Sequence, residues 1–277
     1  MQRTSMITVM NHRHSCRHFQ PKPIPLDQIH ELQAMAHHAQ KGPFGTPLRM
    51  ALHHQSKNGK VGTYGTIRGA QHYLVGTVQN GPRAMEDFGH QFHRILLHAE
   101  ALGLGTCWLG GTFSQGIISQ ELREGEFIPA VSPIGIPAEG FHLVDQATRF
   151  VAQSHKRLPE EKLFFSHHFS KPISSQDLEQ WHAPLFAARL APSASNRQPW
   201  RFSVERHSVQ IGLHRHPMYG AMLKTAKLAD LQRMDIGIAM CQFEFAAREQ
   251  RIPGNWSPLS SPINQGILPI AEWKVVA

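Results

Sequence analysis

The sequence predicts an α+β protein made of two homologous halves, each with a helix pattern that leads through a loop into a strand pattern. Three observations predict this fold class. First, Lys22–Ile24 recurs as Lys171–Ile173, which is 149 residues later (171 − 22). Second, each copy precedes an amphipathic helix pattern whose apolar residues step by three and four. Third, further matches follow in one order at a nearly constant spacing, as an internal repeat requires. We expect a boundary near Pro159, with halves spanning 1–158 and 159–277.

The repeat continues into the long helix pattern of each half. Asp87–Gly89 matches Asp235–Gly237 at a spacing of 148 residues (235 − 87). A single matching tripeptide arises easily by chance, whereas an ordered series at one spacing does not. The other matches at this spacing are Ala99 with Ala247 and Trp108 with Trp256.

Composition limits the class of protein. Of the 277 residues, 41% are hydrophobic and 17% are charged, which is typical of a globular chain. No run of about eighteen apolar residues could form a membrane span, and the first residues lack the apolar core of a signal peptide. Three cysteines without a paired spacing favour a reduced, cytoplasmic setting. We therefore expect a cytoplasmic protein with no membrane partner.

The chain is basic, with a formal net charge of +8 and a pI of about 9.7. Lys and Arg form no dense run and no nucleic-acid-binding motif, so we expect no nucleic-acid partner. A basic surface, or a site for anionic small molecules, explains the charge. The 20 histidines include adjacent pairs such as His37 and His38. Adjacent helix residues face different ways, and no Cys/His cluster accompanies them, so we expect no metal site.

The elements of the first half follow from periodicity and from turn residues. The strongest pattern is a helix over Ala84–Leu102, whose apolar stripe indicates a core element, with Gly103 as its C-terminal cap. The other expected elements are a short helix at Ser5–His12, a helix at Ile29–Ala39, and strands at Leu48–His53, Tyr73–Val78 and Ile128–Pro137.

The second half repeats the order of helix, loop and strand. A helix is expected over Leu178–Ala188, with Ser174 or Ser175 as its N-terminal cap. Ala191–Trp200 contains two prolines, short polar side chains and an amide, so it is a structured loop. A strand pattern follows at Phe202–Arg206.

Arg13–Arg17 reads Arg-His-Ser-Cys-Arg and is a candidate oxyanion site. Its two guanidinium groups supply charged forks of donors, and the serine adds a hydroxyl. A solvated basic turn is the alternative, because a basic cluster alone is a weak signal. Gly103–Gly111 is rich in glycine, which lets the backbone approach a flat ligand closely. Within it, Cys107 and Trp108 are expected to pack rather than react.

Three segments resemble motifs of the FMN-dependent nitroreductases. Pro192–Trp200 matches their PSxxNxQPW loop at the defining positions, and Gly103–Gly111 is close to their GLGT-x-W-x-GG segment. Arg13–Arg17 resembles their RRSxR box, with His14 in place of the second Arg. The resemblance covers nearly the whole chain. In its two-half organisation, the chain resembles the single-chain, tandem branch of the superfamily. It implies a nitroreductase-like fold with two α/β/α half-domains in an intramolecular pseudo-dimer.

The resemblance also implies which residues hold FMN. The basic box would bind the phosphate and ribityl chain, the glycine backbone would face flavin N5, and the proline loop would lie against the flavin from the neighbouring unit. The implied cofactor-binding residues are Arg13, His14, Ser15 and Arg17 in the box; Leu109, Gly110 and Gly111 at the ring; Lys156 and Arg157 closing on the phosphate; and Pro192, Ser193, Ala194 and Asn196 in the loop. A charged linker is the alternative for Lys156 and Arg157.

The two halves differ in what they retain. Against Arg13–Arg17 the second half offers Lys162–Ser166, and against Gly110–Gly111 it offers Pro258–Leu259. Conversely, the first copy of the loop, at 42–47, lacks the Ser, Asn and Gln. By resemblance, these complementary losses predict one retained and one decayed flavin site in a monomeric chain. The long helix of the first half would then pack against 234–248, as two subunits of a dimer do.

The resemblance implies an enzyme, an FMN-dependent oxidoreductase. NADH or NADPH would be a transient electron donor, and a nitroaromatic, quinone or similar small molecule would be the acceptor. Flavin N5 would carry the chemistry, so no catalytic side chain is expected. Two alternatives stay open. The fold could persist with weak or lost flavin binding, as a small-molecule-binding or non-enzymatic protein. The basic charge could instead serve a polyanion.

Overall fold

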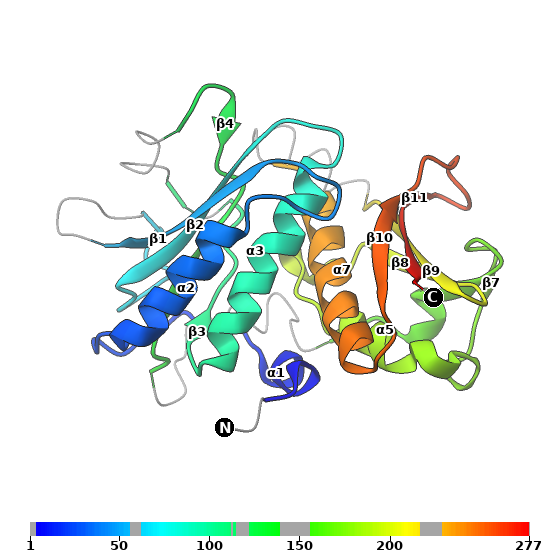
Figure 1. Ribbon diagram of the computed structural model, residues 1–277, viewed down its shortest axis with the longest axis horizontal. Coiled ribbons are helices and arrows are strands. Elements are labelled where there is room, and N and C mark those ends of the chain that lie inside the picture. The colour runs from blue at the N-terminus through cyan, green and yellow to red at the C-terminus, as the bar shows by residue number, and fades with distance from the viewer. Residues whose placement is uncertain are drawn as a thin grey trace.

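A computed structural model describes residues 4–55, 62–111, 113–114, 122–138, 156–216 and 229–276. Two long helices, α3 (Ala84–Ala101) and α7 (Leu231–Glu249), lie side by side at the centre, and one sheet lies on each side of the pair (Figure 1). All strands of the first sheet come from residues 48–135, and all strands of the second come from 164–275. Each sheet therefore belongs to one predicted half, and the two long helices form the most extensive contact between the halves.

The first sheet is antiparallel throughout its described strands, in the order β1-β2-β5-β3, with β4 also paired to β2. Its second strand is buried along almost its whole length because both faces are covered. Leu74 and Val78 pack in a cluster with residues of α2 and α3, and Tyr73 and Val75 pack in another with residues after α1 and after β3. The bounds are α1 Met6–His12, α2 Leu26–His38, β1 Leu48–His54, β2 His72–Gln79, β3 Gly105–Thr106, β4 Glu126–Phe127 and β5 Val131–Gly135.

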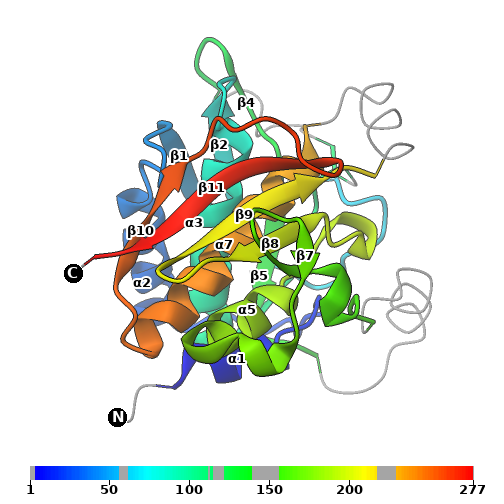
Figure 2. The same ribbon diagram turned by 90° about the vertical axis from the view of Figure 1, so that its right-hand side faces the viewer.

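The second sheet has the order β10-β11-β9-β8-β6-β7, and α5 and α7 pack behind it (Figure 2). Among its described strands, β6 and β8 run parallel, and every other pair is antiparallel. The bounds are β6 Phe164–Ser166, β7 Lys171–Pro172, α5 His182–Arg189, β8 Trp200–Val204, β9 Ser208–His214, β10 Gly254–Pro258 and β11 Ile267–Val275.

The elements expected in the first half are confirmed to within a few residues, and so is the strand after the proline loop. Ser5 caps α1, since its Oγ accepts the N–H of Thr8 at 3.3 Å. Gly103 follows α3 with a φ of +80°, the left-handed conformation that glycine adopts without strain.

The helix expected over Leu178–Ala188 is wrong at its start. Residues 175–181 form 3₁₀ turns, and α5 begins only at His182. Pro184 explains the difference, because proline has no N–H and is tolerated only in the first turn of a helix. The expected cap is also displaced: Ser174 Oγ accepts the N–H of Gln176 at 3.2 Å and so caps a 3₁₀ turn, whereas α5 has no side-chain cap.

Helices α3 and α7 approach each other through matching glycines. A Cβ atom on Gly89 would overlap the backbone carbonyl of Met234, and one on Gly237 would overlap the carbonyl of Glu86. Only glycine at both positions allows the two backbones to touch. These glycines are the last residues of the repeated Asp-x-Gly segments, so the repeat marks the point where the helices cross.

The first residue of each Asp-x-Gly segment holds the proline loop of its own half. Asp87 accepts the backbone N–H groups of Phe44 and Thr46, both at 2.8 Å. Asp235 accepts the N–H of Ala194 at 3.1 Å. Both carboxylates are buried. The same contact thus recurs at corresponding positions in the two halves.

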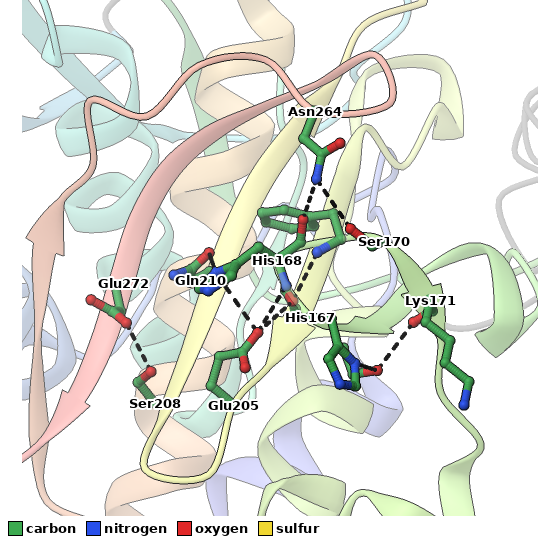
Figure 3. Close-up of polar contacts among 12 residues, drawn as sticks. His167, His168, Ser170, Lys171, Glu205, Ser208, Gln210, Asn264 and Glu272 are labelled. Atoms are coloured by element: carbon green, nitrogen blue, oxygen red, sulfur yellow. Dashed lines mark hydrogen bonds and ion pairs between the residues drawn. The ribbon is translucent and has the colours of Figure 1, made fainter.

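A left-handed turn covers part of the outer face of the second sheet, away from the long helices (Figure 3). His167, His168 and Phe169 have φ values of 52°, 52° and 68°. Side chains hold this strained backbone: Asn264 donates to the carbonyl of His168 at 2.6 Å, and Glu205 accepts its N–H at 3.0 Å. In return, Phe169 is fully buried against β9.

Candidate functional site

A cavity of about 180 Å³ lies where the two halves meet. Its walls come from the segment after α1, the segment after β3, the strand-like residues before β6, the proline loop, and the first turns of α7. The lining residues are Arg13, Ser15, Arg17, Trp108, Gly110, Arg157, Pro192, Ser193, Ala194, Ser195, Asn196, Leu231, Met234, Asp235 and Ile238.

The basic box forms one wall because its segment is extended. Ser15 bridges to Thr106, and the N–H of Cys16 donates to the Thr106 carbonyl at 2.8 Å. Alternate residues of an extended chain point to opposite sides. Arg13, Ser15 and Arg17 therefore line the cavity together, two residues apart each time.

Arg157 adds a third guanidinium group to the lining of the cavity. Its Nη1 donates to Asn196 Oδ1 at 3.3 Å, and its Nη2 donates to the Leu190 carbonyl at 3.0 Å. Burial, together with the nearby charges of Arg13 and Arg189, lowers the pKa of Arg157 to about 10. Three half-buried guanidinium groups facing one cavity produce a positive field that favours an anion.

The proline loop is rigid and strained at the cavity. Ser195 and Asn196 have φ values of 51° and 52°, in the left-handed region. Ser193 Oγ accepts the N–H of Gln198 at 2.9 Å, which closes the loop on itself. Asn196 Nδ2 donates to the Lys156 carbonyl at 2.9 Å, so the loop is fastened to the chain segment that carries Arg157.

Asp235 is the one acid among the lining residues, and it lies under the loop. Burial raises its pKa well above the ordinary range, against the opposing effect of the hydrogen bond from Ala194. Because burial disfavours its charged form, Asp235 competes weakly with an added anion for the arginines of the cavity.

A polar chain supports the wall behind the glycine segment. Trp108 lines the cavity, and its Nε1 donates to His93 Nδ1 at 3.4 Å. His93 Nε2 lies 3.0 Å from the side-chain amide of Gln242. His93 is fully buried, which lowers its pKa well below the ordinary range and keeps it neutral. This series of hydrogen bonds joins α3 to α7 and orients the indole ring of Trp108.

Nine of the predicted cofactor-binding residues meet in this cavity. They are Arg13, Ser15, Arg17, Gly110, Arg157, Pro192, Ser193, Ala194 and Asn196.

Four predicted residues lie elsewhere. His14 faces a separate hollow behind the basic box, on the other side of the extended segment. Leu109 is buried and pairs with Val131. Gly111 lines a neighbouring hollow, and Lys156 contributes its carbonyl to the proline loop rather than its charge to the cavity.

The contribution of α7 to the cavity was missed from the sequence. Leu231, Met234, Asp235 and Ile238 line it, at the spacing of three, four and seven that places residues on one helix face. The sequence shows this periodicity, but a helix face buried in the core produces the same pattern as one that lines a cavity. Trp108 was expected only to pack, whereas it packs against both halves and also lines the cavity.

The corresponding position in the other half is filled by side chains. By the spacing of the repeat, Phe44, Arg83 and Leu259 take the places of Ser193, Leu231 and Gly111. Arg83 Nη2 donates to the Leu259 carbonyl at 2.5 Å, and the Arg83 guanidinium lies 5.9 Å from the centre of the Phe44 ring. Phe44 also packs against the core of the second half.

In the part of the chain that the structure describes, no group of three or more His, Cys, Asp and Glu residues is placed to hold a metal ion. Within the same part, no helix is long and apolar enough to cross a membrane.

Residues 5–247 match the family model described as "Putative TM nitroreductase". No curated protein matches the chain. The crystal structure of a putative nitroreductase from Thermotoga maritima MSB8 is similar, with a TM-score of 0.64 and 16% identity, over 99% of this chain and 95% of that one. A nitroreductase family protein from Clostridium novyi NT has a TM-score of 0.41 and 18% identity, over 49% of this chain and 87% of that one. The first of these similarities confirms the nitroreductase-like α+β fold.

Proposed function

The chain belongs to the putative TM nitroreductase family, and on that premise we propose that it is a flavin-dependent oxidoreductase with one FMN site per chain. NADH or NADPH is its transient electron donor, and a nitroaromatic, quinone or similar electron-poor small molecule is its acceptor. The observation that carries the proposal is the meeting of three guanidinium groups and Ser15 with the proline loop in one cavity.

The residues of the cavity suit FMN in their charge and in the donors they provide. Arg13, Arg17 and Arg157 provide donors for a phosphate, and Ser15 adds a hydroxyl. Gly110 also lines the cavity, and a Cβ there would lie 2.8 Å from Leu231 Cδ2, so only glycine fits between this backbone and the Leu231 side chain. When bound, FMN supplies two-electron chemistry at N5. The protein binds and orients it, and Trp108 with the proline loop shields it from water.

One site per chain follows from the asymmetry between the halves. At the position that corresponds to the cavity, Arg83 contacts both the Leu259 carbonyl and the Phe44 ring, and these contacts support the loss of a second flavin site. Residues 1–158 and 159–277 then act as the two subunits of a dimer joined in one monomeric chain. The α3–α7 contact supports this organisation, since it already joins the halves.

A second candidate function is small-molecule binding without flavin chemistry. The observation that favours it is the size of the cavity, about 180 Å³, because ligand pockets commonly measure about 300–1,000 Å³. Weak or absent FMN binding is its distinguishing property.

The first experiment is the visible spectrum of the purified protein during titration with FMN and, under anaerobic conditions, with NADH or NADPH. We expect saturable FMN binding at one equivalent, bleaching by the donor, and recovery on addition of a nitroaromatic or quinone. A protein whose spectrum shows no FMN binding would support the second candidate function.

The matched variants are Arg13→Ala with Arg17→Ala at the cavity, and Lys162→Ala at the corresponding position of the other half. The double variant should weaken FMN binding by about a hundredfold or more, since each lost charged contact costs about 1.5–3 kcal/mol. Lys162→Ala should bind FMN like the parent, because Lys162 lies on the exposed surface. Equal losses in both would contradict the one-site arrangement.

A further inference from the structure

A second, larger hollow of about 700 Å³ adjoins the cavity. The two share Gly110, and the turn at 229–233 contributes to both, so the hollow opens directly beside the proposed flavin site. Part of its wall is apolar, and the residues that a flat ring could pack against are Met85, Phe113, Phe127, Ile128 and Pro129.

Arg233 is the cationic group that lines this hollow. It lies in the first turn of α7, and a quarter of its side chain is exposed. Its Nε donates to Glu86 Oε1 at 2.7 Å, which fixes the direction of the guanidinium plane. Among the described residues, its two Nη groups donate no hydrogen bond, so these donors can bind a ligand while Nε holds Glu86.

The carboxylates near Arg233 already have cationic partners. Asp230 makes a bidentate contact with Arg215, at 2.6 and 3.2 Å, and Glu126 binds Arg49. Glu86 is fully buried, and burial raises its pKa even though two arginines oppose the shift. Glu86 is itself the ion-pair partner of Arg233 through Nε, so what the hollow offers is the Nη side of this guanidinium beside a partly apolar wall.

From this arrangement we propose that the hollow receives the electron acceptor, that the acceptor is an aromatic compound bearing a carboxylate, and that Arg233 selects it by binding that group. The proposal rests on the proposed function, because it places an acceptor beside the flavin site. Arginine binds a carboxylate through two parallel N–H···O bonds, which adds orientation to affinity. A phosphate of the nicotinamide donor shares this oxyanion chemistry and is the rival source.

The test compares 4-nitrobenzoate with 4-nitrobenzamide, which have similar size and differ in charge. The variants are Arg233→Gln and, as a matched control, Arg206→Gln in the exposed β8–β9 turn, which removes the same charge far from the hollow. Calorimetric titration of the full chain gives affinities without catalysis, and the KM values of both compounds and of NADH are measured on the FMN-loaded protein.

We expect Arg233→Gln to weaken 4-nitrobenzoate binding at least tenfold, to leave 4-nitrobenzamide unchanged, and to match the parent's KM for NADH. Arg206→Gln should resemble the parent throughout. Equal affinity of the parent for the two compounds, or an effect confined to NADH, would overturn the proposal. If Arg233→Gln misfolds because it leaves Glu86 without its partner, the variant with both Glu86→Gln and Arg233→Gln gives the same comparison with a neutral pair.

The two proposals fail in different ways. A protein that binds FMN and reduces 4-nitrobenzamide, but does not prefer 4-nitrobenzoate, retains the proposed function and loses only this inference. A protein that binds no FMN loses the proposed function, and the calorimetric comparison still decides whether Arg233 recognises a carboxylate.

Discussion

Glu100 is a carboxyl group that supports the basic box through Thr106. Its Oε1 accepts the hydroxyl of Thr106 at 2.7 Å, and the Thr106 carbonyl in turn accepts the N–H of Cys16. Burial raises the pKa of Glu100 to about 7, while the Thr106 hydroxyl and Arg13 oppose the shift. Glu100 therefore titrates near neutral pH, and only Thr106 lies between it and the basic box that would bind the phosphate.

Replacement of this group should change how stability depends on pH. The unfolded Glu100 ionises at a pKa of about 4.3, whereas the folded one ionises at about 7. Stability of the parent should fall as pH rises through this interval, because the unfolded chain loses its proton first. Glu100→Gln should remove that loss and stabilise the protein by up to about 3 kcal/mol above pH 7.

Urea denaturation of the parent and of Glu100→Gln between pH 4 and pH 8 measures this effect. Below pH 4.3 both side chains are neutral, so the two proteins should have similar free energies of unfolding. A gap that is constant across the whole pH range would show that the substitution acts through packing and not through the charge of Glu100.

At the scale of elements, the α3–α7 crossing depends on glycine in both helices. Glycine in a helix interior costs about 1 kcal/mol relative to alanine. Gly89 and Gly237 retain that cost because a side chain at either position would overlap a carbonyl of the other helix. Close approach of two buried helices outweighs the helix propensity of the individual residues.

Gly237→Ala should therefore destabilise the protein, although alanine is the better helix former. Separating the backbones costs more than the gain in propensity, and we expect a net loss of about 2 kcal/mol. Chemical denaturation monitored by circular dichroism measures it. Gly81→Ala is the control, because its Cβ would meet only Ala84 Cβ at 3.9 Å. An unchanged or increased stability of Gly237→Ala would mean that the helices separate without cost.

At the scale of the whole molecule, the second half completes the site that the first half begins. Arg13, Ser15 and Gly110 come from one half, while the proline loop and α7 come from the other. In a dimeric protein such a site forms only on association, so its occupancy depends on protein concentration. Here one chain contains both walls, so dilution does not separate them.

We accordingly expect FMN binding to be independent of self-association. The molar mass from light scattering should stay at that of a single chain, 31.2 kDa, across about 1 to 100 µM protein, with the FMN dissociation constant unchanged. A mass that doubles together with a rise in FMN affinity would show that the site requires a second copy of the chain.

Much of this organisation was predictable from local patterns. The periodicity of 84–102 identified its helix, because burial of one face leaves a regular trace in sequence. The strands of the first half were identified by runs of strand-forming residues between turn residues. The motifs located three walls of the cavity. The start of α5 was mispredicted because the apolar spacing before His182 outweighed the effect of Pro184 on helix formation.

Sequence patterns alone identified the fold class, the repeat and nine of the residues that meet in the cavity. The packing of the two halves was needed to show which side of the extended basic box faces the cavity, with Ser15 inside and His14 outside. It also decided that α7 contributes a wall and that Arg83 closes the corresponding position of the other half. The physical reason is that motifs record local conformation and chemistry, whereas the direction of a side chain depends on contacts between segments far apart in the chain.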